Sequence, residues 1–175
     1  MKPDFTVIEA KTFHCGQMSR LLRDEHRAAT VRLGFDTHRE LTARFDESPF
    51  RRAWTINGRL AGLGGIVGSA ISETGQLWLA LSDEARKYPV EVVKESRRQL
   101  AEIMQTKRCL LTTVLDSDES AKRFAIFLGF VPWNGGYKSA VSRDGRRSIF
   151  ASLNDGEARI PVGNGSAVLM NYEAA

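Results

Sequence analysis

The sequence has few cysteines and no long apolar run. Its 175 residues include only two cysteines, Cys15 and Cys109, which lie far apart. Two distant thiols without the short spacing of zinc ligands argue against a disulfide framework and a zinc site, and they favour a reducing compartment. A membrane-spanning helix needs about 20 consecutive apolar residues, and a signal peptide needs an apolar core near its start. Neither pattern is present, so we expect a soluble, cytoplasmic protein with no membrane partner.

Neither sign of charge dominates the composition, because 25 Lys and Arg residues stand against 21 Asp and Glu residues. The net charge of +4 fits a phosphorylated cofactor as partner. No motif of aromatic and basic residues points to nucleic acid, so nucleic acid is not an expected partner. The three histidines, His14, His26 and His38, follow one another at intervals of twelve residues. Metal ligands on one helix are not spaced in this way, so no metal site is expected.

The length corresponds to one domain of ordinary size, and its first part predicts a strand and two helices. Residues 5–10 are rich in β-forming side chains. Apolar positions over residues 18–33 recur at helical spacing, which predicts a single helix. Thr37 and Glu40 form the pattern of a capping box, which predicts that a second helix starts at Thr37 and ends before Pro49.

A β-hairpin is expected next, because Asn57-Gly58 lies between two apolar segments. A type I′ turn needs positive φ at both central positions, and these two residues tolerate it. The strand after the turn is rich in glycine, at Gly62, Gly64, Gly65 and Gly68. A phosphate-binding loop would continue with Lys and Ser or Thr and then a helix, whereas this run leads into another strand. We therefore expect bulges or close approach of backbones in this strand.

The segment from residue 76 to residue 130 predicts a βαβ unit followed by a helix that ends at Gly129. Its parts are a strand over 76–82, a turn over 83–89, a helix over 90–106 and a strand over 108–115. Where the first strand leads into the helix, unpaired N–H groups and the helix dipole favour anions. We therefore expect any phosphate site near residues 82–90. On the helix itself, Gln99 is assigned to the solvent-facing side.

The end of the chain predicts two further hairpins. Strands over 137–142 and 147–153 flank an Asp-Gly turn. A further turn pattern at Gly163-Asn164-Gly165 predicts an added hairpin or arm. We accordingly divide the chain into a main domain over residues 1–153 and an arm over residues 154–175.

The order of these elements resembles that of the GNAT superfamily of acyl-CoA N-acyltransferases over residues 5–153. The resemblance is carried by the strand Leu-Trp-Leu-Ala-Leu-Ser at 77–82 with its helix, and by residues 118–130. In the latter segment the family commonly shows Asn-x-x-Ala-x-x-Leu-Tyr-x-x-x-Gly-Phe. The pattern is also similar to GNAT-like proteins of tailed phages, including internal virion proteins. The resemblance implies an α/β (α+β) fold with a central mixed twisted sheet, about four helices, and fourth and fifth strands that splay apart.

The same resemblance implies an activity, an acyl donor and a set of site residues. The activity is transfer of an acetyl or other acyl group from acetyl-CoA, or another acyl-CoA, to an amine that the sequence does not identify. Asp83 or Glu84 would accept the proton of the amine, directly or through water, and Tyr88 or a solvent molecule would act as acid. The residues implied in donor binding come from the fourth strand, the turn after it and the last helix of the unit: Leu79, Ala80, Leu81, Ser82, Arg86, Lys87, Asp118, Ala121 and Phe124.

The sequence departs from the family pattern at three points. The glycines of the usual pyrophosphate loop are absent after residue 83, so Arg86 and Lys87 are expected to take their role. Ala125 stands where the family often has a tyrosine, and Asp118 stands where it has asparagine. The alternative is therefore a GNAT-like phage protein without catalysis, located in the virion, with a structural or interaction role. A homodimer is compatible with either hypothesis.

Overall fold

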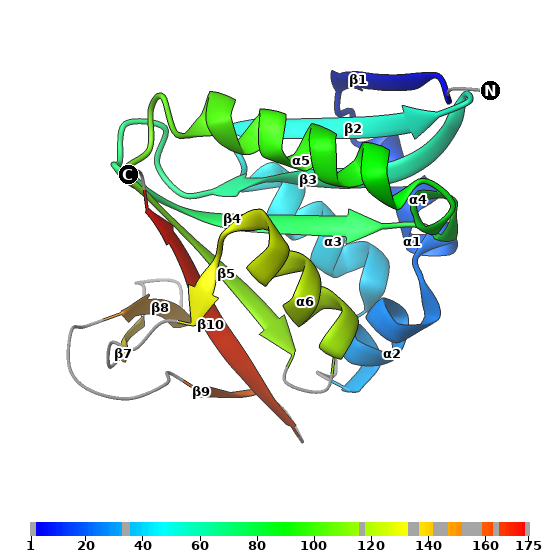
Figure 1. Cartoon of the computed structure of the whole chain (residues 1–175). Helices are drawn as coiled ribbons and strands as arrows, with labels where there is room; N and C mark the ends of the chain where they lie inside the picture. Colours follow the sequence, from blue (N-terminus) through cyan, green and yellow to red (C-terminus); the bar gives the residue numbers. More distant parts are fainter. Residues whose placement is uncertain are drawn as a thin grey trace.

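The computed structural model describes residues 3–32, 36–115, 118–132, 137–141, 147–151, 159–162 and 165–173. Its main sheet has the strand order β1-β2-β3-β4-β5-β10-β6, and β9 pairs with β10 (Figure 1). Neighbouring strands are antiparallel except β4 and β5, which are parallel. The strands of this sheet are β1 (Phe5–Glu9), β2 (Phe50–Ile56), β3 (Arg59–Val67), β4 (Thr74–Leu81), β5 (Cys109–Leu115), β6 (Val131–Pro132), β9 (Arg159–Val162) and β10 (Gly165–Glu173).

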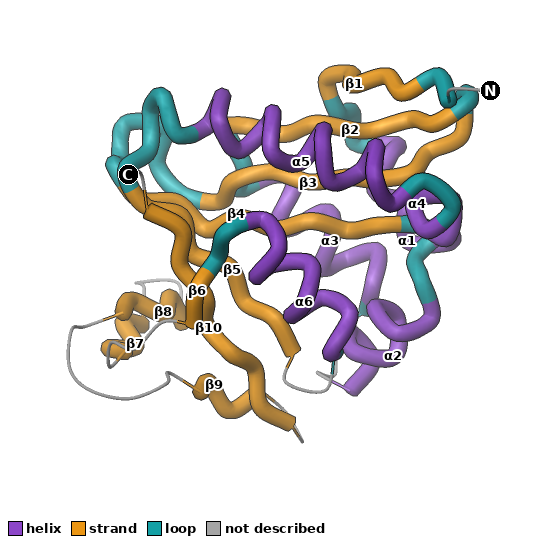
Figure 2. Tube along the Cα trace, viewed as in Figure 1, coloured by secondary structure: helices purple, strands orange, loops and turns teal. Residues whose placement is uncertain are grey.

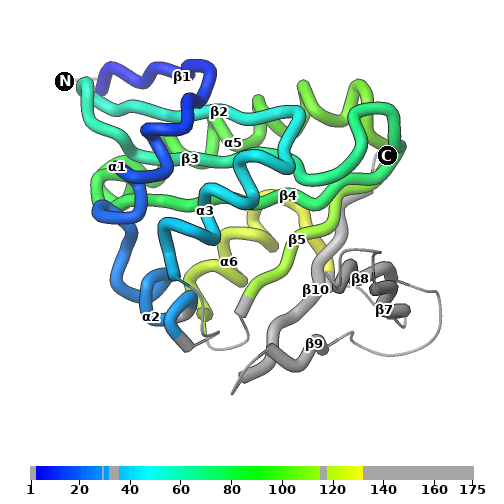
Figure 3. Tube along the Cα trace, turned by 180° about the vertical axis from the view of Figure 1, so that it is seen from behind, coloured from blue at the N-terminus to red at the C-terminus, as the bar shows by residue number. Residues whose placement is uncertain are grey.

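Helices cover both faces of the sheet. In Figure 1, α5 and α6 lie in front of the strands, and the view from behind in Figure 3 shows α1, α2 and α3 on the opposite face. A separate apolar cluster lies under each layer, one with Met18 and Phe45 and another with Leu100 and Phe130. The described helices are α1 (Phe13–Leu21), α2 (Asp24–Arg32), α3 (Thr37–Asp46), α4 (Asp83–Arg86), α5 (Pro89–Ile103) and α6 (Glu119–Leu128).

The single helix predicted over residues 18–33 is wrong, because the chain forms α1 and α2 with a break at Leu22 and Arg23. At the break, Leu22 forms an antiparallel bridge with Ser82, and the Arg23 N–H donates to the Leu81 carbonyl at 3.3 Å. These long-range bonds replace the next helical turn. The start of α3 also differs, since Asp36 is its N-cap and accepts from the Arg39 N–H at 2.8 Å.

The β2–β3 hairpin is confirmed. Asn57 and Gly58 have φ values of 51° and 75°, as the type I′ turn requires. The expected close approach in β3 is confirmed as well. A Cβ at Gly64 would lie 2.8 Å from the Trp78 carbonyl oxygen, and a Cβ at Gly65 would lie 2.5 Å from the Phe50 carbonyl oxygen.

The βαβ unit is confirmed, with two differences in its helix. A single turn, α4, precedes α5, which starts at Pro89, a favourable first helical position because its missing N–H would be unpaired there. Gln99, assigned to the solvent side, is buried with 5% exposure, because α5 is covered by the sheet over a wider arc than the apolar pattern shows. After β5, Asp118 caps α6 and Gly129 ends it with φ 102°, as expected.

The last part of the chain forms one separate hairpin and one hairpin that joins the main sheet. The strands expected on either side of the Asp-Gly turn form β7 (Tyr137–Val141) and β8 (Arg147–Ala151), a separate two-stranded sheet, and the turn lies outside the described residues. The hairpin expected after residue 154 consists of β9 and β10, and β10 pairs with β5 from Ala167↔Leu115 to Glu173↔Cys109. The sequence pattern indicates a strand here but not its partner.

A buried lysine joins the starts of β4 and β5. Lys107 has 6% exposure, and its Nζ donates to the carbonyls of Ser69, Ala70 and Ser72, at 2.8 Å and 3.2 Å for the first two. Next to it, the Arg108 N–H donates to the Glu73 carbonyl at 2.7 Å. The loop before β4 is thereby tied to the residues before β5.

We expect Lys107→Met to destabilise the fold by about 1–3 kcal/mol, because it removes a charged donor from several carbonyls. Chemical denaturation would measure the change. Lys94→Met is the matched control, since Lys94 lies on the exposed side of α5. Equal stability of the two variants would contradict a role for Lys107 in holding the two strands together.

Candidate functional site

The two parallel strands β4 and β5 separate after three residue pairs. They pair at Thr74↔Cys109, Gly75↔Leu110 and Gln76↔Leu111. At the next position the Thr112 hydroxyl donates to the Leu77 carbonyl at 3.1 Å. Beyond it the strands diverge, as Figure 2 shows. We call the opening between residues 77–81 of β4 and residues 112–115 of β5 the fork.

The N–H and C=O groups of successive β4 residues point alternately toward β3 and toward the fork. The Ser82 N–H donates to the Ala61 carbonyl of the β3 strand at 2.9 Å, so Ala80 and Ser82 turn their backbone groups toward β3. Leu79 and Leu81 turn theirs toward the fork. The Leu81 carbonyl accepts from Arg23, whereas Leu79 has no strand partner on this side within the described part of the chain. Two of the four strand residues expected to bind a donor thus present backbone groups to the fork.

Helix α2 lies at the mouth of the fork, next to α4 on one side and within electrostatic reach of the start of α6 on the other. On the β4 side, the Glu25 carboxylate forms an ion pair with Arg86 of α4. On the β5 side, His26 lies near Asp118, the N-cap of α6. Burial, followed by the nearby Arg23, lowers the pKa of His26 from 6.5 to about 4, so its imidazole is neutral at pH 7. Nothing in the local sequence pattern identified Glu25, His26 or Thr112, because their partners lie far along the chain.

The two predicted phosphate-binding cations are exposed and already paired with carboxylates. Besides Glu25, Arg86 faces Asp83 at 3.8 Å, and Lys87 lies 2.9 Å from Glu84. The hydrogen bond to Glu25 raises the pKa of Arg86. An incoming anion would therefore have to exchange with these carboxylates.

The predicted catalytic residues lie around α4 and not together at the fork. Asp83 is exposed, with 66% of its side chain accessible. The hydrogen bond from Lys87 lowers the pKa of Glu84, whose carboxylate also lies 3.7 Å from Arg59. The Tyr88 hydroxyl accepts from the Asn57 amide at 3.0 Å, which places it at the β2–β3 turn, two strands away from β5.

Helix α6 forms the other wall of the fork. Asp118 accepts from the Ala121 N–H at 2.9 Å, and Ala121 is partly buried against the cluster that contains Leu110 and Val114. Phe124 packs against that cluster and against the one that Leu79 joins. The structure thus brings Phe124 and Leu79 to the same side of the sheet. Ala125 is buried in the core under α6.

Among the residues that the structure describes, no group of three or more His, Cys, Asp and Glu residues could hold a metal ion. In the same part of the chain, no helix combines the length and the apolar character needed to cross a membrane.

No protein-family model and no curated protein sequence matches this chain. Solved structures do match it. A GNAT-family acetyltransferase from Streptococcus pneumoniae has a TM-score of 0.53 at 16% identity, with 98% of this chain and 100% of that chain covered. Spermidine N-acetyltransferase from Vibrio cholerae, solved with CoA and spermine, has a TM-score of 0.59 at 11% identity, with 97% and 95% covered.

A further match is the microcin C7 self-immunity acetyltransferase, solved with acetyl-CoA and AMP. It has a TM-score of 0.60 at 8% identity, with 98% of this chain and 93% of that chain covered. Identities this low show the fold alone. The chain has the fold of the GNAT acetyltransferases.

Proposed function

We propose that the chain is an N-acyltransferase that moves an acetyl or other acyl group from acyl-CoA to an amine. The observation that carries this proposal is the early end of the β4–β5 pairing at Gln76, which leaves the backbone of Leu79 without a strand partner within the described residues. An extended, amide-containing chain can pair with such an edge as an added strand. The pantetheine arm of CoA is a chain of this kind, and two matched structures of this fold were solved with CoA or acetyl-CoA.

The chemistry needs little from side chains. The amine nitrogen attacks the thioester carbonyl, the C–N bond forms, the C–S bond breaks, and the thiolate leaves and takes up a proton. Negative charge develops on the carbonyl oxygen during the attack. The Leu79 N–H is a fixed donor at the fork and would stabilise that charge, an effect typically worth about 10²–10³ in rate. The fork holds the donor in place while the amine approaches.

The phosphates of the donor would lie at the β4–α5 connection. Pro89 lacks an N–H, so fewer backbone donors are available there than a glycine-rich loop would offer. Arg86 and Lys87 would supply charge-assisted contacts after they release Glu25 and Glu84. Asp118, Ala121 and Phe124 would flank the donor from α6.

Proton transfer from the amine would pass through water to a carboxylate. Of the two candidate bases, Asp83 is the more accessible, while Glu84 is held by Lys87 and has a lowered pKa. A lowered pKa makes a carboxylate a weaker base at neutral pH. Tyr88 would need to leave its hydrogen bond with Asn57 before it could act as acid.

The alternative is a structural or interaction protein that has kept this fold without catalysis, as in the phage proteins whose pattern it resembles. Two observations favour it. Ala125, at the position of the family tyrosine, is buried with 6% exposure and cannot donate a proton. The cations expected to bind phosphate are neutralised by carboxylates of the chain itself.

We expect Glu25→Gln to tighten CoA binding two- to fivefold, because it frees Arg86 from an exposed ion pair worth roughly 0.2–1 kcal/mol. Arg86→Ala should weaken binding about tenfold. Isothermal titration with CoA would measure both. Asp24→Asn removes the same charge from the neighbouring position of α2 and serves as control. If Glu25→Gln and Asp24→Asn have the same affinity, Arg86 does not contact the phosphates.

We expect Ala125→Tyr to lower the free energy of unfolding by about 1–3 kcal/mol without raising turnover, since the larger ring must enter a packed core. Thermal melting and a free-thiol release assay on the same variant would test this. A stable variant with faster turnover would contradict the expectation and show that position 125 can reach the donor sulfur.

A further inference from the structure

A narrow apolar slot lies between α5 and the sheet, with a volume of about 50 Å³. Leu77, Leu79 and Gly64 line it on the sheet side, and Ser96, Gln99 and Leu100 line it on the α5 side. The slot depends on Gly64. A Cβ there would lie 3.1 Å from the Leu79 side chain and 2.8 Å from a backbone oxygen, so the strand carries no side chain below the helix at this point.

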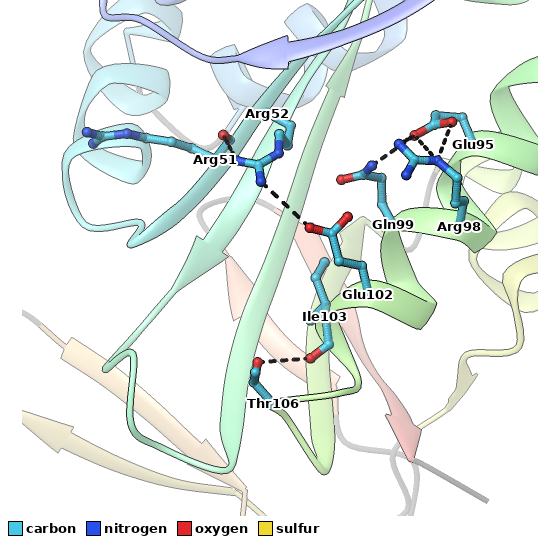
Figure 4. A network of polar contacts seen from close by, with 8 residues as sticks. All are labelled: Arg51, Arg52, Glu95, Arg98, Gln99, Glu102, Ile103 and Thr106. Carbon is cyan, nitrogen blue, oxygen red and sulfur yellow. Dashed lines mark hydrogen bonds and ion pairs between the residues drawn. The ribbon is translucent and has the colours of Figure 1, made fainter.

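One polar atom in the slot has no partner. Gln99 is 5% exposed, and its Nε2 donates to the Glu95 carboxylate at 2.8 Å, which fixes the orientation of the amide. Its Oε1 is buried and accepts no hydrogen bond from any described residue. Figure 4 shows this oxygen turned away from Glu95, on the side of Arg52. Buried carbonyl oxygens are nearly always hydrogen-bonded, so a donor is missing from this place.

Two leucines connect the slot with the fork. Leu77 and Leu79 line the slot, and their backbone edges face the fork. At the end of the slot away from the fork, Arg52 and Glu102 form an ion pair at 3.7 Å (Figure 4). A thioester held next to the backbone of Leu79 would therefore lie beside the slot.

We propose that the slot receives the acyl chain of the donor and selects a chain of about four carbons with a hydroxyl group that donates to Gln99 Oε1. This rests on the proposed acyl-CoA chemistry at the fork. The length follows from the volume. The centre of a water-sized group has about 50 Å³ of open space in the slot, and one such group needs roughly 10–15 Å³ counted in this way, so about three to five groups fit. An acetyl group would leave the slot empty, whereas two more carbons and one hydroxyl are three such groups.

The test is isothermal titration of the full chain with free CoA, acetyl-CoA, butyryl-CoA and 3-hydroxybutyryl-CoA. Each buried methylene group should tighten binding about fourfold, so butyryl-CoA, with two more, should bind about fifteenfold more tightly than acetyl-CoA. The hydroxyl should add about threefold or more by satisfying the unpaired oxygen.

Two variants separate the apolar and the polar part of the slot. Ser96→Leu should fill the slot and remove the preference for butyryl-CoA over acetyl-CoA, whereas its control Ser96→Ala should keep that preference. Gln99→Met has nearly the same shape without the oxygen, so it should keep the butyryl preference and lose the hydroxyl preference. Its melting temperature should rise, because an unpaired buried acceptor is removed.

The outcomes are distinguishable. If free CoA and all three thioesters fail to bind, the proposed acyltransferase function is wrong and the slot proposal falls with it. If CoA and acetyl-CoA bind but the longer chains bind no more tightly, the slot proposal alone is overturned. A hydroxyl preference that survives Gln99→Met would overturn the role of Gln99. If Ser96→Leu fails to fold, the affinities of the wild type for the four CoA compounds and those of Gln99→Met still test the slot proposal.

Discussion

The separation of β4 from β5 is the constraint on which the proposed site depends. Two parallel strands would normally continue to pair, and here each is held elsewhere. At the closed end, Lys107 ties the loop before β4 to the residues before β5. Beyond it, β3 holds one side of β4 and β10 holds the outer side of β5 along its whole length. The opening is therefore set by bonds on the outer sides of both strands, and it exists without a ligand between them.

The electrostatics of the mouth follow from the same arrangement. Because the strands separate, their two following helices, α4 and α6, end up on opposite sides of an opening at whose mouth α2 lies. Carboxylates of the chain itself neutralise the cations there: Glu25 pairs with Arg86, and Glu84 pairs with Lys87. The Glu25–Arg86 pair is exposed and contributes little to stability, so breaking it would cost little, whereas the Glu84 side chain is only 13% exposed. A site that is charge-balanced when empty need not be inactive.

Features encoded by neighbouring residues could be predicted from the sequence, and features made by distant partners could not. Asn57-Gly58, the Asp118 cap and the Gly129 stop each act within a few residues, and the structure contains all three. The break at Leu22 depends on its bridge with Ser82, and the burial of Gln99 depends on the sheet opposite α5. The position of β10 depends on its pairing with β5. Around the fork, the sequence indicated the strand β4 and the cations Arg86 and Lys87, but the carboxylate partner of Arg86 on α2, Glu25, was hidden in what reads as one continuous helix.

The position of β10 also has a consequence for the order of folding. The strand that completes the outer side of β5 follows it by about fifty residues, so this pairing has a high sequence separation and forms slowly. Until it forms, β5 presents an open, apolar edge, which is a template for pairing with other chains. The same strand that holds the fork open is therefore the one whose late arrival leaves the nascent protein prone to aggregation.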